Sequence, residues 1–192
     1  MLRLAVLISG SGTDLQSIID HRNQINGEIA LVISNRKNAY GLQRAQDAGI
    51  KNLVIKNQDE LLNTLKEEKI DFIVLAGYLA ILGKELIDTY QNKIINIHPS
   101  LIPSFVGPGM YGLHVHEAVL ERGVKVSGAT VHFVSEEVDG GPIIWQEAVS
   151  IADLETPEDI QKRVLEVEHK ILPEVVQWIC DGKVVIEKGR VK

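Results

Sequence analysis

Short apolar runs alternate with amphipathic stretches along most of this 192-residue chain. The runs predict strands, and the stretches between them, with apolar side chains three and four positions apart, predict helices. Strands are expected at residues 2–9, 28–35, 52–56, 71–77, 93–99, 128–134 and 142–151, with a short one at 183–189. Helices are expected at residues 14–22, 39–49, 59–69, 82–90, 114–123 and about 157–180.

This order of elements predicts an α/β fold. Strands that alternate with helices form βαβ units around a mainly parallel sheet that is covered on both faces. We expect a Rossmann-like, doubly wound, mainly parallel sheet with an antiparallel C-terminal portion, because the last part reads strand, strand, helix. No repeat or linker-like composition divides the chain, so residues 1–192 are expected to form one domain. Ligands of such sheets bind outside the carboxyl ends of the strands. Binding and catalytic residues are therefore expected just after the strands.

Composition narrows the classes of partner. The net charge of −6 argues against a protein that binds duplex nucleic acid, whose binding face is normally basic. No apolar run approaches the ~20 residues that span a bilayer, and the first strand runs into a glycine turn in place of a signal-peptide cleavage site. The single cysteine, Cys180, is read as a small buried hydrophobe and suits a reducing compartment. A cytoplasmic protein without nucleic-acid or membrane partners is expected, as a monomer or homodimer.

A glycine turn follows the first strand. Gly10 and Gly12 permit the tight turn, and the backbone N–H groups of residues 12–14 would face an anion at the start of a helix. The dinucleotide fingerprint needs a third glycine where Leu15 stands, so the phosphate of a mononucleotide fits better. Arg36 leaves an NADP-dependent reductase open, because arginine after the second strand binds a ribose phosphate in such enzymes.

The same turn has a purely structural interpretation, in which Asp14 is simply the N-cap of the helix. A non-catalytic nucleotide-binding module is a further alternative.

Two polar side chains stand at the end of an isoleucine-rich strand. Alternation places Asn96 and His98 on one face with Ile94, and Pro99 stops the strand. An amide stabilises an oxyanion and an imidazole exchanges protons near neutral pH, but a hydrogen-bonded core pair fits the spacing equally well. Asp139 lies on a glycine-rich loop, where aspartate is most often a turn former. It gains a functional role only if this loop meets His98.

The other histidines carry less information. His114 and His116 are two positions apart, so they do not share a helical face, and no metal-ligand cluster completes a site. His132 lies within a strand and is interpreted as a hydrogen-bonded sheet residue. No nucleophile motif is present, which favours direct transfer between two bound substrates without metal or covalent catalysis.

Four segments together resemble the phosphoribosylglycinamide formyltransferases, which are folate-dependent formyltransferases. They are LISGSGTDLQSII (7–19), LAGYLAIL (75–82), IINIHPSLIPSF (94–105) and GATVHFVSEEVDGGPII (128–144). The resemblance implies an enzyme that moves the formyl group of 10-formyltetrahydrofolate to glycinamide ribonucleotide in purine (IMP) biosynthesis. The chain has no room for the extra domain that methionyl-tRNA formyltransferases or formyltetrahydrofolate deformylases carry, so a single formyltransferase domain is expected.

The resemblance also implies a set of site residues. The catalytic residues would be Asn96, His98 and Asp139. The ribonucleotide phosphate and ribose would contact Gly12, Thr13, Asp14 and Glu168. The folate would contact Leu79, Ala80, Ile81, Leu82, Asn96, Val134, Val138 and Asp139.

Some positions depart from the family pattern. Asp14 stands where many members have asparagine, so its ionised side chain cannot donate to phosphate. Ala80 replaces an arginine that some members use at the folate. Lys56 is a candidate for the basic residue that meets phosphate, and residues 106–116 form a longer segment that is expected to act as a flap over the site.

Overall fold

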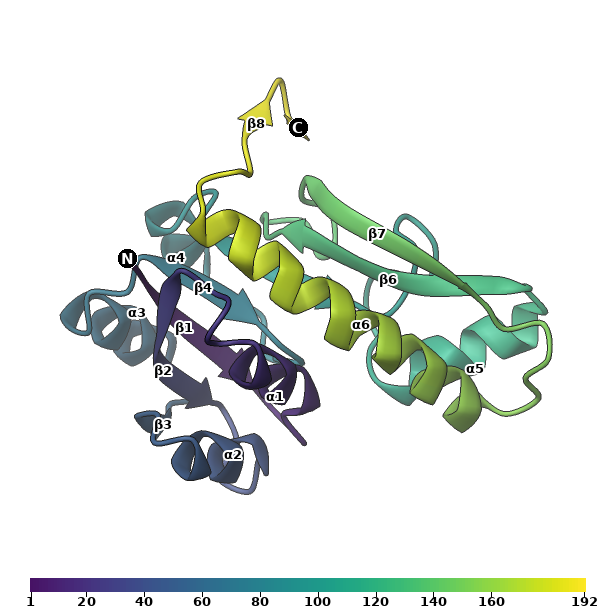
Figure 1. Ribbon diagram of the computed structural model, residues 1–192, viewed down its shortest axis with the longest axis horizontal. Helices are drawn as coiled ribbons and strands as arrows, with labels where there is room; N and C mark the ends of the chain where they lie inside the picture. Colours follow the sequence, from purple (N-terminus) through teal and green to yellow (C-terminus); the bar gives the residue numbers. More distant parts are fainter.

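The computed structural model describes all 192 residues and contains one seven-stranded sheet in the order β3-β2-β1-β4-β5-β6-β7 (Figure 1). Its strands are β1 (Leu2–Ile8), β2 (Gly27–Ser34), β3 (Asn52–Val54), β4 (Phe72–Leu75), β5 (Ile94–His98), β6 (Val126–Phe133) and β7 (Ile143–Ser150). The helices are α1 (Thr13–Asp20), α2 (Gly41–Asp47), α3 (Gln58–Glu67), α4 (Lys84–Thr89), α5 (Leu113–Arg122) and α6 (Pro157–Cys180).

The sheet is parallel from β1 to β5 and antiparallel at β6 and β7. The expected α/β fold with an antiparallel C-terminal portion is therefore confirmed. Parallel neighbours follow from the helical crossovers between β1 and β5, since a chain that returns through a helix enters the sheet in the same direction.

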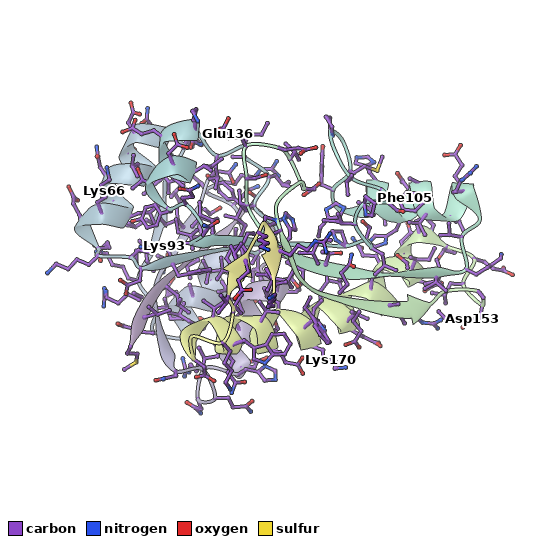
Figure 2. All side chains as sticks on the ribbon, turned by 90° about the horizontal axis from the view of Figure 1, so that it is seen from above. Lys66, Lys93, Phe105, Glu136, Asp153 and Lys170 are labelled. Carbon is purple, nitrogen blue, oxygen red and sulfur yellow. The ribbon has the colours of Figure 1, made fainter.

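Alternation along the strands separates two apolar cores, one on each face of the sheet. In β1, Leu4 and Val6 face the core beneath α1, α2, α5 and α6, whereas Ala5 and Leu7 face the core beneath α3 and α4. Figure 2 shows Lys66 of α3 and Lys170 of α6 on opposite sides of the molecule. This two-sided burial explains why the central strands are almost wholly apolar.

The long helix α6 has the bounds that its sequence predicts. Thr156 caps it by accepting a hydrogen bond from the backbone N–H of Asp159 at 3.2 Å, and Pro157 occupies the first turn, where a missing N–H costs nothing. Figure 1 shows α6 crossing the sheet beside α1 and α5, and it packs against both helices. This position brings residues near its middle to the glycine turn after β1.

The C-terminal segment differs from the expectation of one short strand at 183–189. It forms a two-stranded hairpin, β8 (Ile186–Glu187) and β9 (Arg190–Val191), outside the main sheet. Both turn residues, Lys188 and Gly189, have positive φ angles of 51° and 75°, the conformation that a tight two-residue hairpin requires. None of the helices has an apolar stretch that would suffice to span a bilayer.

Candidate active site

Asn96 and His98 lie at the carboxyl end of β5, between parallel β4 and antiparallel β6. Ile95 and Ile97 point into the α6-side core and Ile94 into the other, so the predicted alternation of faces is correct. His98 is 4% exposed. The strand therefore delivers an amide and an imidazole to one side of its end, as the sequence pattern indicates.

The ring of His98 is fixed by the turn that follows β5. Its Nε2–H donates to the carbonyl of Phe105 at 2.8 Å. This carbonyl is held in place because Ser100 and Thr130 brace the turn: the Ser100 hydroxyl donates to Ser104 O at 2.6 Å, and the Thr130 hydroxyl donates to Ser100 O at 2.7 Å. The other ring nitrogen, Nδ1, remains for chemistry and faces the glycine-rich loop after β6.

Asp139 lies on that loop and faces two histidines. Its Oδ2 is 3.6 Å from His98 Nδ1 and its Oδ1 is 3.7 Å from His132 Nε2. Both distances exceed a direct hydrogen bond but leave the carboxylate in electrostatic contact with the two rings. The backbone N–H of Gly107 also approaches Oδ2, at 3.4 Å, which places the start of the 106–116 segment against this carboxylate. The loop of Asp139 therefore meets His98 and the turn that follows β5. This is the contact that a functional role for Asp139 requires.

The backbone of the loop holds Asp139 in a left-handed conformation, with φ of 56°. Aspartate adopts this conformation more readily than most residues. Two residues later the chain passes so close to β6 that a Cβ on Gly141 would lie 1.8 Å from the carbonyl oxygen of Phe133. Only glycine fits at this position. The close approach to β6 therefore fixes the backbone of the loop that carries Asp139.

His132 joins the site from β6, which the sequence did not reveal. It pairs directly across from Asn96 in the antiparallel register. Its Nδ1–H donates to Phe133 O at 2.9 Å, so Nε2 accepts from the Asn96 amide at 3.2 Å. Burial is the largest cause of a lowered pKa for His132, which favours this neutral acceptor form. The interpretation as a hydrogen-bonded sheet histidine was incomplete, because the bond orients the amide of a candidate catalytic residue.

Replacing His132 with leucine is expected to lower kcat by about 10-fold, because the Asn96 amide loses the acceptor that orients it. Its KM values should change little, since His132 is 2% exposed and lies behind Asn96. Steady-state kinetics of the formyl transfer that the sequence resemblance implies, compared with those of Thr64→Ala in α3, measures this effect. A variant with wild-type kcat would show that Asn96 needs no such support.

The expected folate segment, residues 79–82, is exposed next to the loop of Asp139. Leu79 and Ile81 are 41% and 79% exposed, and Val138 on the loop is 50% exposed. Leu82 differs, because its side chain is buried in the α3/α4-side core and only its backbone remains for a ligand. Val134 and Ala80 are half-buried. Exposed apolar side chains of this kind suit a flat, partly apolar ligand.

Hydrogen bonds from neighbouring elements hold residues 79–83 in place. The N–H of Leu79 donates to the Ser9 hydroxyl at 2.9 Å. Gln58 accepts from the N–H of Gly83 at 3.0 Å and donates to the carbonyl of Ile81 at 3.2 Å. The segment also approaches the Asp139 loop, since Lys84 forms an ion pair with Glu136.

The glycine turn after β1 has Gly12 as the N-cap of α1, with φ of 71° and no side-chain cap. The interpretation of Asp14 as N-cap is therefore wrong. The first N–H groups of a helix have no intrahelical partner, so residues 12–14 can present theirs to an anion. Arg44 of α2 contacts this turn, with Nε–H donating to Ser11 O at 2.8 Å. Lys56, the candidate cation, instead lies exposed beyond β3, two strands away from β1.

Two carboxyl groups are buried behind the turn, where α1 packs against α6. Asp14 is 9% exposed and Glu168 is 5% exposed. Burial raises the pKa of Asp14 to about 7, and burial together with the nearby Asp14 carboxyl raises the pKa of Glu168 well above its usual range. The structure thus brings together two of the expected ribonucleotide-binding residues from positions more than 150 residues apart in sequence.

The raised pKa of Asp14 predicts a pH-dependent stability. The folded chain binds more protons at this group than the unfolded chain between pH 4 and 7, so the free energy of unfolding falls as pH rises through this window. Asp14→Asn should therefore be more stable than the wild type at pH 8 by about 1–3 kcal/mol, and nearly equal to it at pH 4. Urea denaturation at both pH values measures the difference, and an equal difference at both would contradict the assignment.

Comparisons with known proteins identify the family of this chain. A family model described as formyl transferase matches residues 2–176. The phosphoribosylglycinamide formyltransferase of Escherichia coli K12 is 39% identical over 199 residues, which are 98% of this chain and 92% of that protein. The chloroplastic phosphoribosylglycinamide formyltransferase of Arabidopsis thaliana is 40% identical over 194 residues, which are 95% of this chain and 66% of the plant protein. The chain thus spans about two thirds of the length of this plant relative.

A solved structure shows the same fold. Glycinamide ribonucleotide transformylase 1 from Symbiobacterium toebii superposes with a TM-score of 0.93 at 42% identity, covering 100% of this chain and 93% of that one. The likeness covers the whole chain and therefore includes the seven-stranded sheet. With a family model matched over most of its length and relatives at about 40% identity, this chain belongs to the formyl transferase family.

Proposed function

We propose that this chain is a phosphoribosylglycinamide formyltransferase, which transfers the formyl group of 10-formyltetrahydrofolate to the amine of glycinamide ribonucleotide in purine biosynthesis. The observation that carries the proposal is the meeting of Asn96, His98 and Asp139 at the end of β5. The family and the names of the relatives support the same reaction. We further propose that residues 1–192 act as one formyltransferase domain.

The proposed mechanism depends on which atoms of Asn96, His98 and Asp139 can contact the substrates. The substrate amine attacks the formyl carbon, and an oxyanion develops on the formyl oxygen. The Asn96 amide and the Nδ1–H of protonated His98 stabilise this oxyanion, since His98 Nε2–H already donates to Phe105 O. Asp139 orients His98 and accepts the proton that the amine loses, through a bridging water. The bond from the formyl carbon to the folate nitrogen then breaks, and that nitrogen takes up the proton that Asp139 accepted.

The two substrates would approach from different strand ends. The ribonucleotide phosphate would bind the N–H groups of Gly12, Thr13 and Asp14, and Glu168 would accept from the ribose hydroxyls. The folate ring would lie against residues 79–82 and 134–139, next to Asn96. Both positions lie at the carboxyl edge of parallel strands, β1 for the phosphate and β4 and β5 for the folate. The amine and the formyl group would thus meet at His98.

Purified protein mixed with both substrates tests the proposal by the release of tetrahydrofolate, followed by absorbance. We expect turnover only when glycinamide ribonucleotide is present. Folate turnover that needs no ribonucleotide would identify a hydrolase, and no turnover at all would reject formyl transfer. The cytoplasmic location and the monomer or homodimer expected from the sequence stay predictions.

A further inference from the structure

Two buried polar atoms without hydrogen-bond partners face each other behind the glycine turn. They are Oδ1 of Asp14 on α1 and Nε2 of His169 on α6, 3.4 Å apart. A buried polar atom without a partner is costly, and a proton between these two atoms would satisfy both. The side chain of Asp14 is 12% exposed, so water offers it little compensation.

The surroundings of the pair disfavour an ionised Asp14. Glu168 of α6 is buried close to Asp14, and two neighbouring carboxyl groups with few water contacts do not readily ionise together. The cation nearest the turn, Arg44 of α2, is engaged by Ser11 O at 2.8 Å and by Gln16 Oε1 at 3.3 Å.

The charge of His169 depends on three influences. Burial and the charge of Arg44 lower its pKa, whereas Asp20 on α1 raises it. The net effect is a lowered pKa, so a neutral imidazole is favoured beside Asp14. No lysine or arginine forms an ion pair with Asp14, whose one ion-pairing candidate is this histidine.

We propose that Asp14 and His169 form a proton-holding pair behind the phosphate turn, and that this pair takes up a proton when a phosphate monoester binds there. The ligand class rests on the function proposed above. A phosphate dianion at the start of α1 places negative charge next to the Asp14 carboxyl, and protonation of that carboxyl removes the repulsion. A protonated Asp14 is also a hydrogen-bond donor, which an ionised aspartate is not.

Proton uptake gives the binding a distinctive pH dependence. Burial raises the pKa of Asp14 to about 7, so this group is mostly ionised at pH 8 in the free protein. Binding at pH 8 should then consume up to one proton, and the affinity should fall by up to about 10-fold for each pH unit above 8. Asparagine at this position is neutral at every pH and cannot take up a proton.

Isothermal titration calorimetry with glycinamide ribonucleotide at pH 8, in buffers of different ionisation enthalpy, counts the protons. The wild type should take up between half a proton and one proton, and Asp14→Asn none. Asp47→Asn, which changes an exposed aspartate at the end of α2, should behave like the wild type. Equal uptake by the wild type and Asp14→Asn would overturn the proposal, as would binding of the wild type without uptake.

A second measurement separates this proposal from the proposed function. Side-chain carboxyl ¹³C NMR of the ligand-free protein should show one aspartate that titrates near pH 7 and is missing in Asp14→Asn. Titration of Asp14 near pH 4 would overturn the proton-holding pair even if formyl transfer is confirmed. If the wild type does not bind the ribonucleotide, the proposed function and the coupling to binding both fail, whereas a titration near pH 7 would still show that the buried Asp14 carboxyl binds a proton near neutral pH.

Discussion

Asp139→Asn is expected to lower kcat for formyl transfer by about 10²–10⁴, the usual range for removing a general acid or base. Asparagine has nearly the same shape as aspartate and tolerates the left-handed backbone at this position, where φ is 56°. The loop should therefore keep its course past Phe133, and the N–H of Gly107 retains an oxygen acceptor. The amide, however, neither accepts the proton of the substrate amine nor carries the charge that faces His98 and His132.

The matched control is Asp153→Asn, which removes an exposed carboxylate that pairs with Arg163. Asp153 lies at one end of the molecule, far from Glu136 on the loop of Asp139 (Figure 2). This variant should stay within about twofold of wild-type kcat, because exposed ion pairs contribute little. If Asp139→Asn also stays within twofold of wild-type kcat, Asp139 is a turn former and the proposed proton transfer is wrong.

His98→Ala should lower kcat by about 10²–10³, the typical loss for one donor to an oxyanion. The substitution also removes the donor to Phe105 O and leaves a small cavity, which should cost about 1–3 kcal/mol of folding stability. Substrate binding should change much less than kcat, since the phosphate turn and residues 79–82 do not depend on this ring.

Stability and chemistry are separated by measuring kcat well below the melting temperature of the variant, with circular dichroism as the check on folding. Thr64→Ala in α3 is again the control, because Thr64 lies outside the segments assigned to either substrate. A folded His98→Ala protein with wild-type kcat would establish His98 as a structural residue of the core. The non-catalytic nucleotide-binding module would then be the better account.

Periodicity along the chain was sufficient to predict the main sheet and its helices. Apolar runs and helical spacing are local, and the β5 alternation that aligns Asn96 with His98 is local too. The C-terminal hairpin was missed because its turn, Lys188-Gly189, has only a weak sequence signal and its strands have two residues each. Short strands outside a core are determined by turn conformation more than by apolar pattern.

The contacts between distant elements could not be predicted from residue patterns. His132 meets Asn96 through the register of β5 and β6, and Asp14 meets His169 through the packing of α1 on α6. Register and helix packing depend on the tertiary structure. The residues alone left Asp139 as a turn former, and only its resemblance to a family motif suggested the role that its distance from His98 now supports.

The central claim is that the formyl group passes directly to the ribonucleotide amine at the end of β5. A single-turnover reaction with 10-formyltetrahydrofolate labelled with ¹³C in the formyl group, quenched and analysed by NMR, follows this carbon. We predict that the label appears as the formamide of the ribonucleotide in an amount equal to the enzyme-bound folate. Label recovered as free formate, or left on the folate while both substrates are bound, would contradict the account.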